Sequence, residues 1–330
     1  MSIKNIIRLF LYIPLISLFI AFILGFFNTF HPFLDSLSHF RVHLLIIFLP
    51  LLIIVAFFHE KYIMSTYFFL IVLGGGYLYW ILQPFKSEEV DVTKVHPLKH
   101  VQFNLSYKNQ RMEDVKKFLI EKNVDIVTLQ EVTTAHKEAL EEMKLVEGLS
   151  VKFSTKYPYF SRKKGVYPYQ HYCNFQSVGG VAVLSRYPID VEKSICIKGE
   201  GLVSASVKVN DATINVISLH LHWPFPYGQT KQVETIRQVF KNLSTPLLVA
   251  GDFNAVAWSN TLKKIEKASD TKVVNGLRWS INLKKQLPLI PAMSLSIDHV
   301  LVSSEFQVDA ITVGEDLGSD HFPIITDLRY

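Results

Sequence analysis

The chain has 330 residues, enough for one large domain or two smaller ones. Its net charge of +5 at pH 7 is compatible with an anionic partner but too small to require a polyanion. The hydrophobic share of 49% and the mean hydropathy of +0.23 are high for a purely soluble protein, and almost all of the excess lies before Gln83.

Residues 1–85 are predicted to form a membrane anchor. Three apolar blocks predict about three membrane helices, over residues 6–27, 42–58 and 62–82. The first and third blocks lack carboxylates and are long enough to cross a hydrocarbon core of about 30 Å. The second is shorter and contains a proline, so whether it spans is left open. A cleavable signal peptide is the alternative for the first block, but no small-residue cleavage site follows it closely and two more apolar blocks come next.

The orientation of this anchor depends on the number of spans. Lys4, Arg8 and Lys61 share one side, and Arg41 and Lys86 share the other, so the positive-inside rule favours a cytoplasmic N-terminus only slightly. Three spans place the remainder of the chain outside the cytoplasm, and two spans place it inside. We therefore expect an integral membrane protein whose C-terminal domain is extracytoplasmic if all three blocks span.

Residues 86–97 are polar and charged without a helical or strand period, which predicts a linker, and residues 98–330 are predicted to be a globular domain. The two cysteines, Cys173 and Cys196, could pair in an oxidising compartment, but two buried free thiols are the preferred interpretation. The sequence does not indicate a protein partner.

The globular part alternates short apolar strands with helices and turns. Apolar residues at helical spacing predict an amphipathic helix over residues 112–122, and a second helix is predicted over residues 229–243, between two strands. Strands are predicted over residues 100–105, 125–129, 180–184, 205–209, 214–219, 246–250 and 297–302. Because strands outnumber helices and many are close neighbours, we predict a layered α/β sandwich rather than a purely parallel sheet.

Polar residues with catalytic chemistry fall at the ends of these strands. They are Asn104, Glu131, His220, Asp252, Asn254, Asp298, Asp320 and His321. Repeated placement at strand ends gathers side chains that are distant in sequence at one rim of a sheet sandwich. Carboxylates, amides and imidazoles without a cysteine cluster favour Mg²⁺ or Mn²⁺ over Zn²⁺.

The motifs around these residues resemble the endonuclease/exonuclease/phosphatase superfamily, the DNase-I-like metal-dependent phosphoesterases. The matching segments are Phe103–Leu105, Leu129–Glu131, Gly180–Pro188, Ser218–His220, Gly251–Asn254, Ile297–Val300 and Ser319–His321. One such segment is weak evidence, but the full series follows the family's order over nearly all of residues 98–328. The resemblance implies a four-layer α/β/β/α sandwich, preceded here by N-terminal transmembrane helices.

The resemblance also implies how the metal and the attacking water are held. Glu131 corresponds to the principal metal ligand, and Asn104 and Asp320 would help to order the metal and its waters. Asp252 would position or deprotonate the attacking water, while Asn254 would hold the phosphate.

Two imidazoles complete the implied site. His321, oriented by Asp298, would act as an acid or base or as a charged contact to the phosphate. His220 would bind the phosphoryl oxygens opposite and protonate the leaving group. Family members often orient the counterpart of His220 with a second carboxylate, and the corresponding stretch of this chain has none. A backbone carbonyl, or an amide such as Asn174 or Gln176, would have to replace it.

The implied activity is that of a membrane-anchored, divalent-metal-dependent phosphoesterase that hydrolyses phosphodiester bonds. Its substrate is left open between nucleic acid, which would make it a nuclease, and a phospholipid, sphingolipid or small phosphorylated compound, which the membrane tether favours. The segment 223–227, directly after His220, is expected to form a wall of the site that accepts bases, sugar rings or lipid headgroups. A non-catalytic membrane protein of the same fold is the third possibility, and the complete residue set argues against it.

Overall fold

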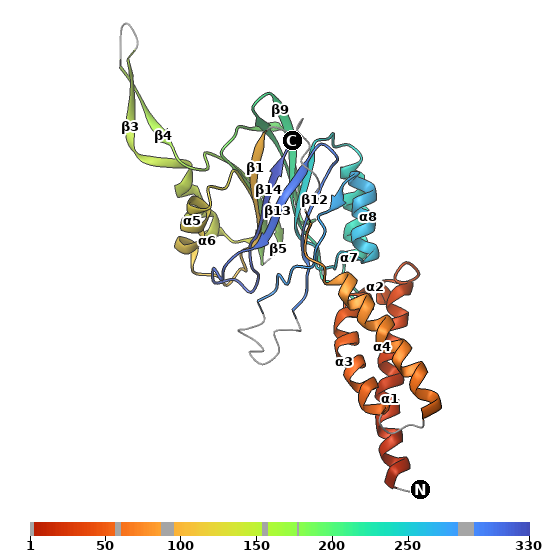
Figure 1. The fold of residues 1–330 in the computed structure, drawn as a ribbon. Helices are drawn as coiled ribbons and strands as arrows, with labels where there is room; N and C mark the ends of the chain where they lie inside the picture. Colours follow the sequence, from red (N-terminus) through yellow and green to blue (C-terminus); the bar gives the residue numbers. More distant parts are fainter. Residues whose placement is uncertain (1–2, 57–60, 87–95, 154–157, 177, 283–293) are drawn as a thin grey trace.

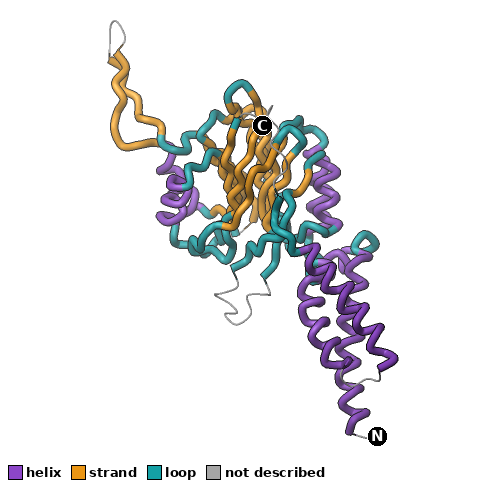
Figure 2. Tube along the Cα trace, in the orientation of Figure 1, coloured by secondary structure: helices purple, strands orange, loops and turns teal. Residues whose placement is uncertain are grey.

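The computed structural model describes residues 3–56, 61–86, 96–153, 158–176, 178–282 and 294–330 (Figure 1). It consists of an N-terminal helical bundle and a domain built around β-sheets, which Figure 2 distinguishes by colour. Most of the predicted linker, residues 87–95, lies outside the described residues.

The N-terminal part contains helices at all three predicted apolar blocks. They are α1 (Ile3–Leu24), α3 (Arg41–Ala56) and α4 (Lys61–Ile81), with the short helices η1 (Gly25–Phe27) and α2 (Pro32–Ser38) between the first two. Helix α3 packs against both α1 and α4, around a core that includes Leu45, Phe48 and Leu52.

Among the described helices, α1 alone is long and apolar enough by itself to cross a membrane, and a signal sequence would meet the same criterion. Helices α2 and α3 are long and apolar enough only when they are taken together as one span bent by 60°. The apolar part of α4, Tyr67–Ile81, is shorter than a membrane span by this criterion. Three separate spans therefore stay a prediction.

The domain contains two six-stranded sheets. The first has the order β13 (Gln307–Val313), β14 (Ile324–Arg329), β1 (Pro97–Asn104), β2 (Ile126–Val132), β6 (Gly179–Ser185) and β5 (Tyr169–Gln176). The second has the order β11 (Lys272–Val273), β12 (Asp298–Val302), β10 (Leu247–Asp252), β9 (Ala212–His220), β8 (Leu202–Val209) and β7 (Ile189–Ile197). A separate hairpin, β3 (Leu145–Phe153) and β4 (Pro158–Lys164), projects away from the sandwich (Figure 1).

Helices cover the outer faces of both sheets. Helices α5 (Met112–Glu121) and α6 (Thr134–Glu141), followed by the short helix η2 (Glu142–Lys144), share an apolar core with the first sheet. Helices α7 (Gln229–Phe240) and α8 (Asn260–Ser269) share another with the second sheet, and a third core lies between the sheets. This arrangement confirms the predicted four-layer α/β/β/α sandwich.

The sheet topology brings the predicted strand ends together. Strands β1 and β2 are parallel neighbours in one sheet, and β9 and β10 are parallel neighbours in the other. The carboxyl ends of parallel neighbours lie at the same edge, so the polar residues that follow them share a rim. In the second sheet, Asp252 at the end of β10 is in register with His220 on one side and Asp298 on the other.

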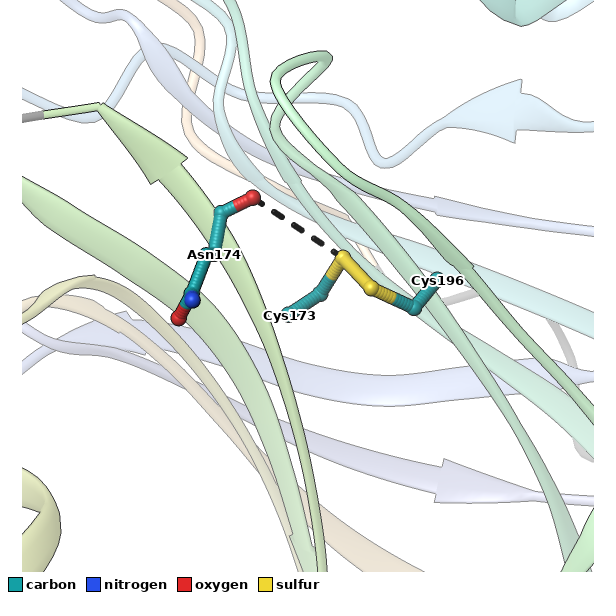
Figure 3. The surroundings of a disulfide bond; sticks show 3 residues. All are labelled: Cys173, Asn174 and Cys196. Atoms are coloured by element: carbon teal, nitrogen blue, oxygen red, sulfur yellow. Dashed lines mark hydrogen bonds between the residues drawn. A yellow bond between two sulfur atoms is a disulfide. The ribbon is translucent and has the colours of Figure 1, made fainter.

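The two cysteines form a disulfide, so the interpretation of two free thiols is wrong (Figure 3). Cys173 lies on β5 and Cys196 on β7, and their Cα atoms are 5.3 Å apart. Because β5 and β7 are edge strands of different sheets, the bond joins the two sheets. The sequence could not predict this pairing, since it depends on how the two sheets lie against each other.

Candidate active site

Asp252 lies at the centre of the site. It is the last residue of β10, and its buried Oδ2 is 3.6 Å from Nε2 of His220 and 3.8 Å from Nε2 of His321. The glycine before it is required by the sheet, because a Cβ on Gly251 would overlap the backbone oxygen of Leu219 on β9. The Gly-Asp pair therefore allows close strand pairing and still places a carboxylate between two imidazoles.

Asp298 and His321 form a buried pair. Nδ1 of His321 is 2.8 Å from Oδ2 of Asp298, whose Oδ1 accepts a hydrogen bond from Nε2 of Gln102 at 2.9 Å. Burial lowers the pKa of His321, but the carboxylates of Asp298 and Asp252 outweigh it and raise that pKa to about 10. The contact with Asp298 fixes the orientation of the His321 ring, and the two carboxylates favour its protonated form.

The two buried aspartates have opposite pKa shifts. Burial raises the pKa of Asp252, and the Asp298 charge raises it further, against the opposing effects of the two histidines and the backbone N–H of Asn254. Burial also raises the pKa of Asp298, but the adjacent His321 outweighs burial and lowers it overall. Asp252 is therefore the better proton acceptor of the two.

Asn104 connects Asp252 to Glu131. Its Nδ2 donates to Oδ2 of Asp252 at 3.0 Å and lies 3.2 Å from Oε1 of Glu131. The other oxygen of Glu131 accepts the backbone N–H of Tyr107 at 2.8 Å. Glu131 has a φ of 53°, a left-handed backbone that is sparsely populated outside glycine and often found at functional sites. A Cβ on Gly179 would come within 2.7 Å of the Glu131 backbone, so this bulge needs a glycine beside it.

The Ser319–His321 segment is attached to the end of β1. The hydroxyl of Ser319 donates to the Asn104 carbonyl at 2.7 Å and accepts the N–H of His321 at 2.9 Å. Asp320 is half-buried, and its carbonyl accepts the N–H of Asn282 at 2.7 Å. These bonds place Asp320 and His321 at the rim that carries Asn104, as the strand-end motifs predict.

His220 differs from His321 in how its ring is held. Its Nδ1 is buried without a hydrogen-bond partner among the described residues, and its ring packs edge-on against Phe175. Gln176, one of the amides expected to orient it, instead lies 3.0 Å from Nδ1 of His222. The expectation that an amide fixes the tautomer of His220 is therefore wrong for Gln176, whose amide contacts a different imidazole.

Two buried glutamines of α7 hold the loops of the site, and sequence analysis did not identify them. Gln232 accepts the N–H of His222 at 2.6 Å and donates to the carbonyl of His220 at 2.9 Å. Gln229 donates to the carbonyls of His222 and Asn254 at 3.0 and 3.2 Å. Their spacing of three residues on the buried face of an amphipathic helix is the signal that could have indicated them.

Asn254 occupies the turn after Asp252. Its φ is 46°, its N–H donates to Oδ1 of Asp252 at 2.9 Å, and its Nδ2 donates to the Leu221 carbonyl at 2.8 Å. One N–H of that amide remains for a substrate.

The model of the endonuclease/exonuclease/phosphatase family matches residues 101–321, about two thirds of the chain. This protein belongs to the endonuclease/exonuclease/phosphatase family. All eight predicted site residues lie within the matched range, and no curated protein matches the chain significantly.

Solved structures of the family share the fold at low sequence identity. The endonuclease/exonuclease/phosphatase from Bacteroides vulgatus aligns with a TM-score of 0.54 and 16% identity over 71% of this chain and 99% of that chain. The one from Beutenbergia cavernae aligns with a TM-score of 0.50 and 16% identity over 71% of this chain and 72% of that chain. These similarities establish the fold and leave the substrate open.

The residues at the rim suit a divalent cation. Ligand atoms of Asp252, Asp298 and His321 lie within 4.8 Å of one another, the one such group among the described residues, but Asp298 already binds the His321 ring. The half-buried carboxylates of Glu131 and Asp320 have no lysine or arginine partner among the residues described. Such oxygen donors fit Mg²⁺ or Mn²⁺.

Proposed function

We propose that this family member is a membrane-anchored, metal-dependent phosphodiesterase. The observation that carries the proposal is the buried Asp252 carboxylate, which lies within 4 Å of two imidazoles and is linked through Asn104 to Glu131. A proton acceptor, two cationic or proton-donating groups and a metal-type carboxylate are the components that phosphodiester hydrolysis requires.

Asp252 accepts a proton from the attacking water. Its raised pKa makes it a better base than an ordinary aspartate, because proton transfer is favoured when the pKa of the acceptor is closer to the working pH. His321, held as an imidazolium by Asp298, directs Nε2 toward the same position and stabilises negative charge on the phosphoryl oxygens.

His220 and Asn254 act on the other side of Asp252. His220 donates a proton to the leaving oxygen, and the free amide hydrogen of Asn254 binds a phosphoryl oxygen. Glu131 and Asp320 would hold Mg²⁺ or Mn²⁺, with Asn104 orienting the Glu131 carboxylate. When bound, the cation supplies Lewis-acid stabilisation of the phosphate charge.

The proposed location is a membrane, with the domain outside the cytoplasm. Helix α1 supplies the apolar segment, and three spans would place the domain on that side. The disulfide between Cys173 and Cys196 supports this placement, because disulfides persist mainly in oxidising compartments.

The test is hydrolysis of bis-p-nitrophenyl phosphate by the full chain in detergent with Mg²⁺ or Mn²⁺. We expect turnover that EDTA abolishes and added metal restores, and that Asp252→Ala and His321→Ala each remove. No turnover with either metal, or full activity in both variants, would contradict the proposal.

A further inference from the structure

The helical anchor contacts the rim of the domain that carries the site. Trp258, in the loop after β10, donates from Nε1 to the carbonyl of Ser38 at 2.8 Å, and its own carbonyl accepts from Nδ2 of Asn28 at 3.1 Å. Ser294, in the segment before β12, has its carbonyl 3.1 Å from Nε2 of His43. Both segments adjoin the strand ends where the candidate site lies, so the anchor and the site share one edge of the sandwich.

A buried carboxylate of the anchor strengthens this attachment. Asp35 on α2 accepts hydrogen bonds from the backbone N–H groups of Asn260 and Thr261 at 2.7 and 3.0 Å, at the start of α8. The first turn of a helix has unpaired N–H groups and a partial positive charge, which a carboxylate satisfies. Figure 1 shows α2 beside α7 and α8, with the rest of the bundle extending away from the domain.

Polar contacts continue from the anchor to the site. The hydroxyl of Thr261 lies 2.9 Å from Oδ2 of Asp35 and 3.2 Å from Oε1 of Gln229, and Gln229 donates to the carbonyl of Asn254. On the other side of the attachment, Gly276 packs against the backbone of Phe85, just after α4. The site is therefore held in one orientation relative to the helices, with its rim on the side of the domain to which they attach.

Exposed aromatic side chains lie at the same junction. Trp223 and Tyr227, in the loop between His220 and α7, are 60% and 68% exposed. In the same loop, the Phe225 ring lies 6.1 Å from that of Phe33 on α2. Phe30, just before α2, is 79% exposed. Tryptophan and tyrosine are enriched where a protein crosses the membrane–water interface, so this loop is suited to the headgroup layer.

We propose that the substrate of the site is a phospholipid of the leaflet on the domain's own side of the membrane. The inference rests on the phosphodiesterase activity proposed above, and it identifies the substrate class. A lipid headgroup presents its phosphodiester in the layer that the rim faces. A nucleic acid would have to enter between the rim and the bilayer, where the headgroups already lie.

The reaction is hydrolysis and needs no further reactant. The water oxygen forms a bond to phosphorus as its proton passes to Asp252, and one P–O ester bond of the lipid breaks. The leaving oxygen takes a proton from His220 and departs as an alcohol, which leaves a phosphomonoester.

The experiment uses the full chain reconstituted into vesicles with Mg²⁺. Fluorescent phosphatidylcholine or sphingomyelin is placed either in the vesicles that hold the protein or in separate, protein-free vesicles. We expect hydrolysis to be at least about tenfold faster in the shared vesicle, because the anchor gives those lipids a high effective concentration at the site. Equal rates in the two arrangements, or faster hydrolysis of added DNA or RNA, would overturn the inference.

Bis-p-nitrophenyl phosphate, added to the same vesicles, separates this inference from the proposed activity. Turnover of that compound without turnover of either lipid would contradict the proposal of a lipid substrate but not the proposed phosphodiesterase activity. Loss of both activities overturns the phosphodiesterase itself.

A double variant tests the aromatic loop. Trp223→Ser with Tyr227→Ser is expected to lower the ratio of lipid to bis-p-nitrophenyl phosphate hydrolysis about fivefold, because less apolar area enters the interface. Val191→Ser is the matched control, since Val191 is 66% exposed on β7, away from this junction. If the double variant does not fold, Phe30→Ser in the anchor is expected to lower the ratio in the same direction. An unchanged ratio in a folded variant would contradict the proposal.

Discussion

The two imidazoles beside Asp252 are fixed by different parts of the molecule. His321 is held through its ring, whose Nδ1 lies 2.8 Å from the buried carboxylate of Asp298. His220 is held through its backbone, whose carbonyl accepts from Gln232, while its Nδ1 has no partner among the described residues.

This difference separates two chemical roles. A carboxylate on the ring fixes both the tautomer and the positive charge of an imidazole, so His321 is suited to stabilise charge on the phosphate. A backbone bond fixes only the position of the ring, and no described residue bonds to Nδ1 of His220 to hold the ring in one tautomer. His220 is therefore the better candidate for the group that donates a proton to the leaving oxygen.

Asp252→Asn should have the largest effect, because it removes the partner that both imidazoles share. We expect kcat for bis-p-nitrophenyl phosphate to fall by about 10³-fold or more, since the amide cannot accept the water's proton. Thermal unfolding of the variant serves as the control for folding. A fall of less than about tenfold would mean that Asp252 is not the group that accepts the water's proton.

Asp298→Asn removes the carboxylate that holds His321 and also a charge that raises the pKa of Asp252. Without this charge the pKa of His321 should fall from about 10, so the imidazole loses its proton at a lower pH and the alkaline limb of the rate profile shifts down. We expect a loss of about 100-fold in kcat at pH 8, with the histidine titration followed by NMR on metal-free protein.

Asp327→Asn is the matched control for that experiment, because Asp327 pairs with Lys99 on the surface. An unchanged titration of His321 in Asp298→Asn would refute the assigned pair.

His220→Asn should lower the rate by an amount that depends on the leaving group. We expect a loss of about 100-fold for an alkyl diester such as glycerophosphocholine, whose leaving oxygen needs a proton. The loss should be smaller for bis-p-nitrophenyl phosphate, whose leaving group is stable as an anion. His321→Asn should lower the rate of hydrolysis of both substrates by a similar factor. If the two variants lose the same activity on each substrate, the two imidazoles do not have the different roles proposed here.

The sequence predicts which side chains form this site better than it predicts the residues that those side chains contact. Asp252, Asp298 and His321 each adjoin a recognisable strand, where a buried charge needs a partner, and the structure brings them together. The four-layer fold follows from the same motifs. The atoms that each side chain contacts depend on rotamers, so the amide of Asn104 bridging two carboxylates could not be anticipated.

Contacts between elements that are distant in the chain could not be predicted from the sequence either. Cys173 and Cys196 pair only because the edges of two sheets meet, and Asp35 reaches α8 from a helix more than 200 residues earlier. The place of Gln232 on the buried face of an amphipathic helix could have indicated its burial, but the carbonyl that its amide contacts depends on the fold.

Gln232→Leu should give the smallest effect and show whether His220 is positioned from its backbone. The change leaves the His220 carbonyl without its amide donor, so we expect kcat to fall about three- to tenfold and the unfolding temperature to drop, since an unsatisfied buried carbonyl costs about 1–3 kcal/mol. Gln238→Leu, an exposed site on the same helix, is the control.

Double variants test whether Gln232 acts through His220. The effects of coupled substitutions on kcat are not additive, so adding Gln232→Leu to His220→Asn should lower kcat little further. Adding it to His321→Asn should lower kcat by the same factor as in the unmodified protein. Equal losses in both backgrounds would show that Gln232 supports the fold in general rather than the His220 side of the site.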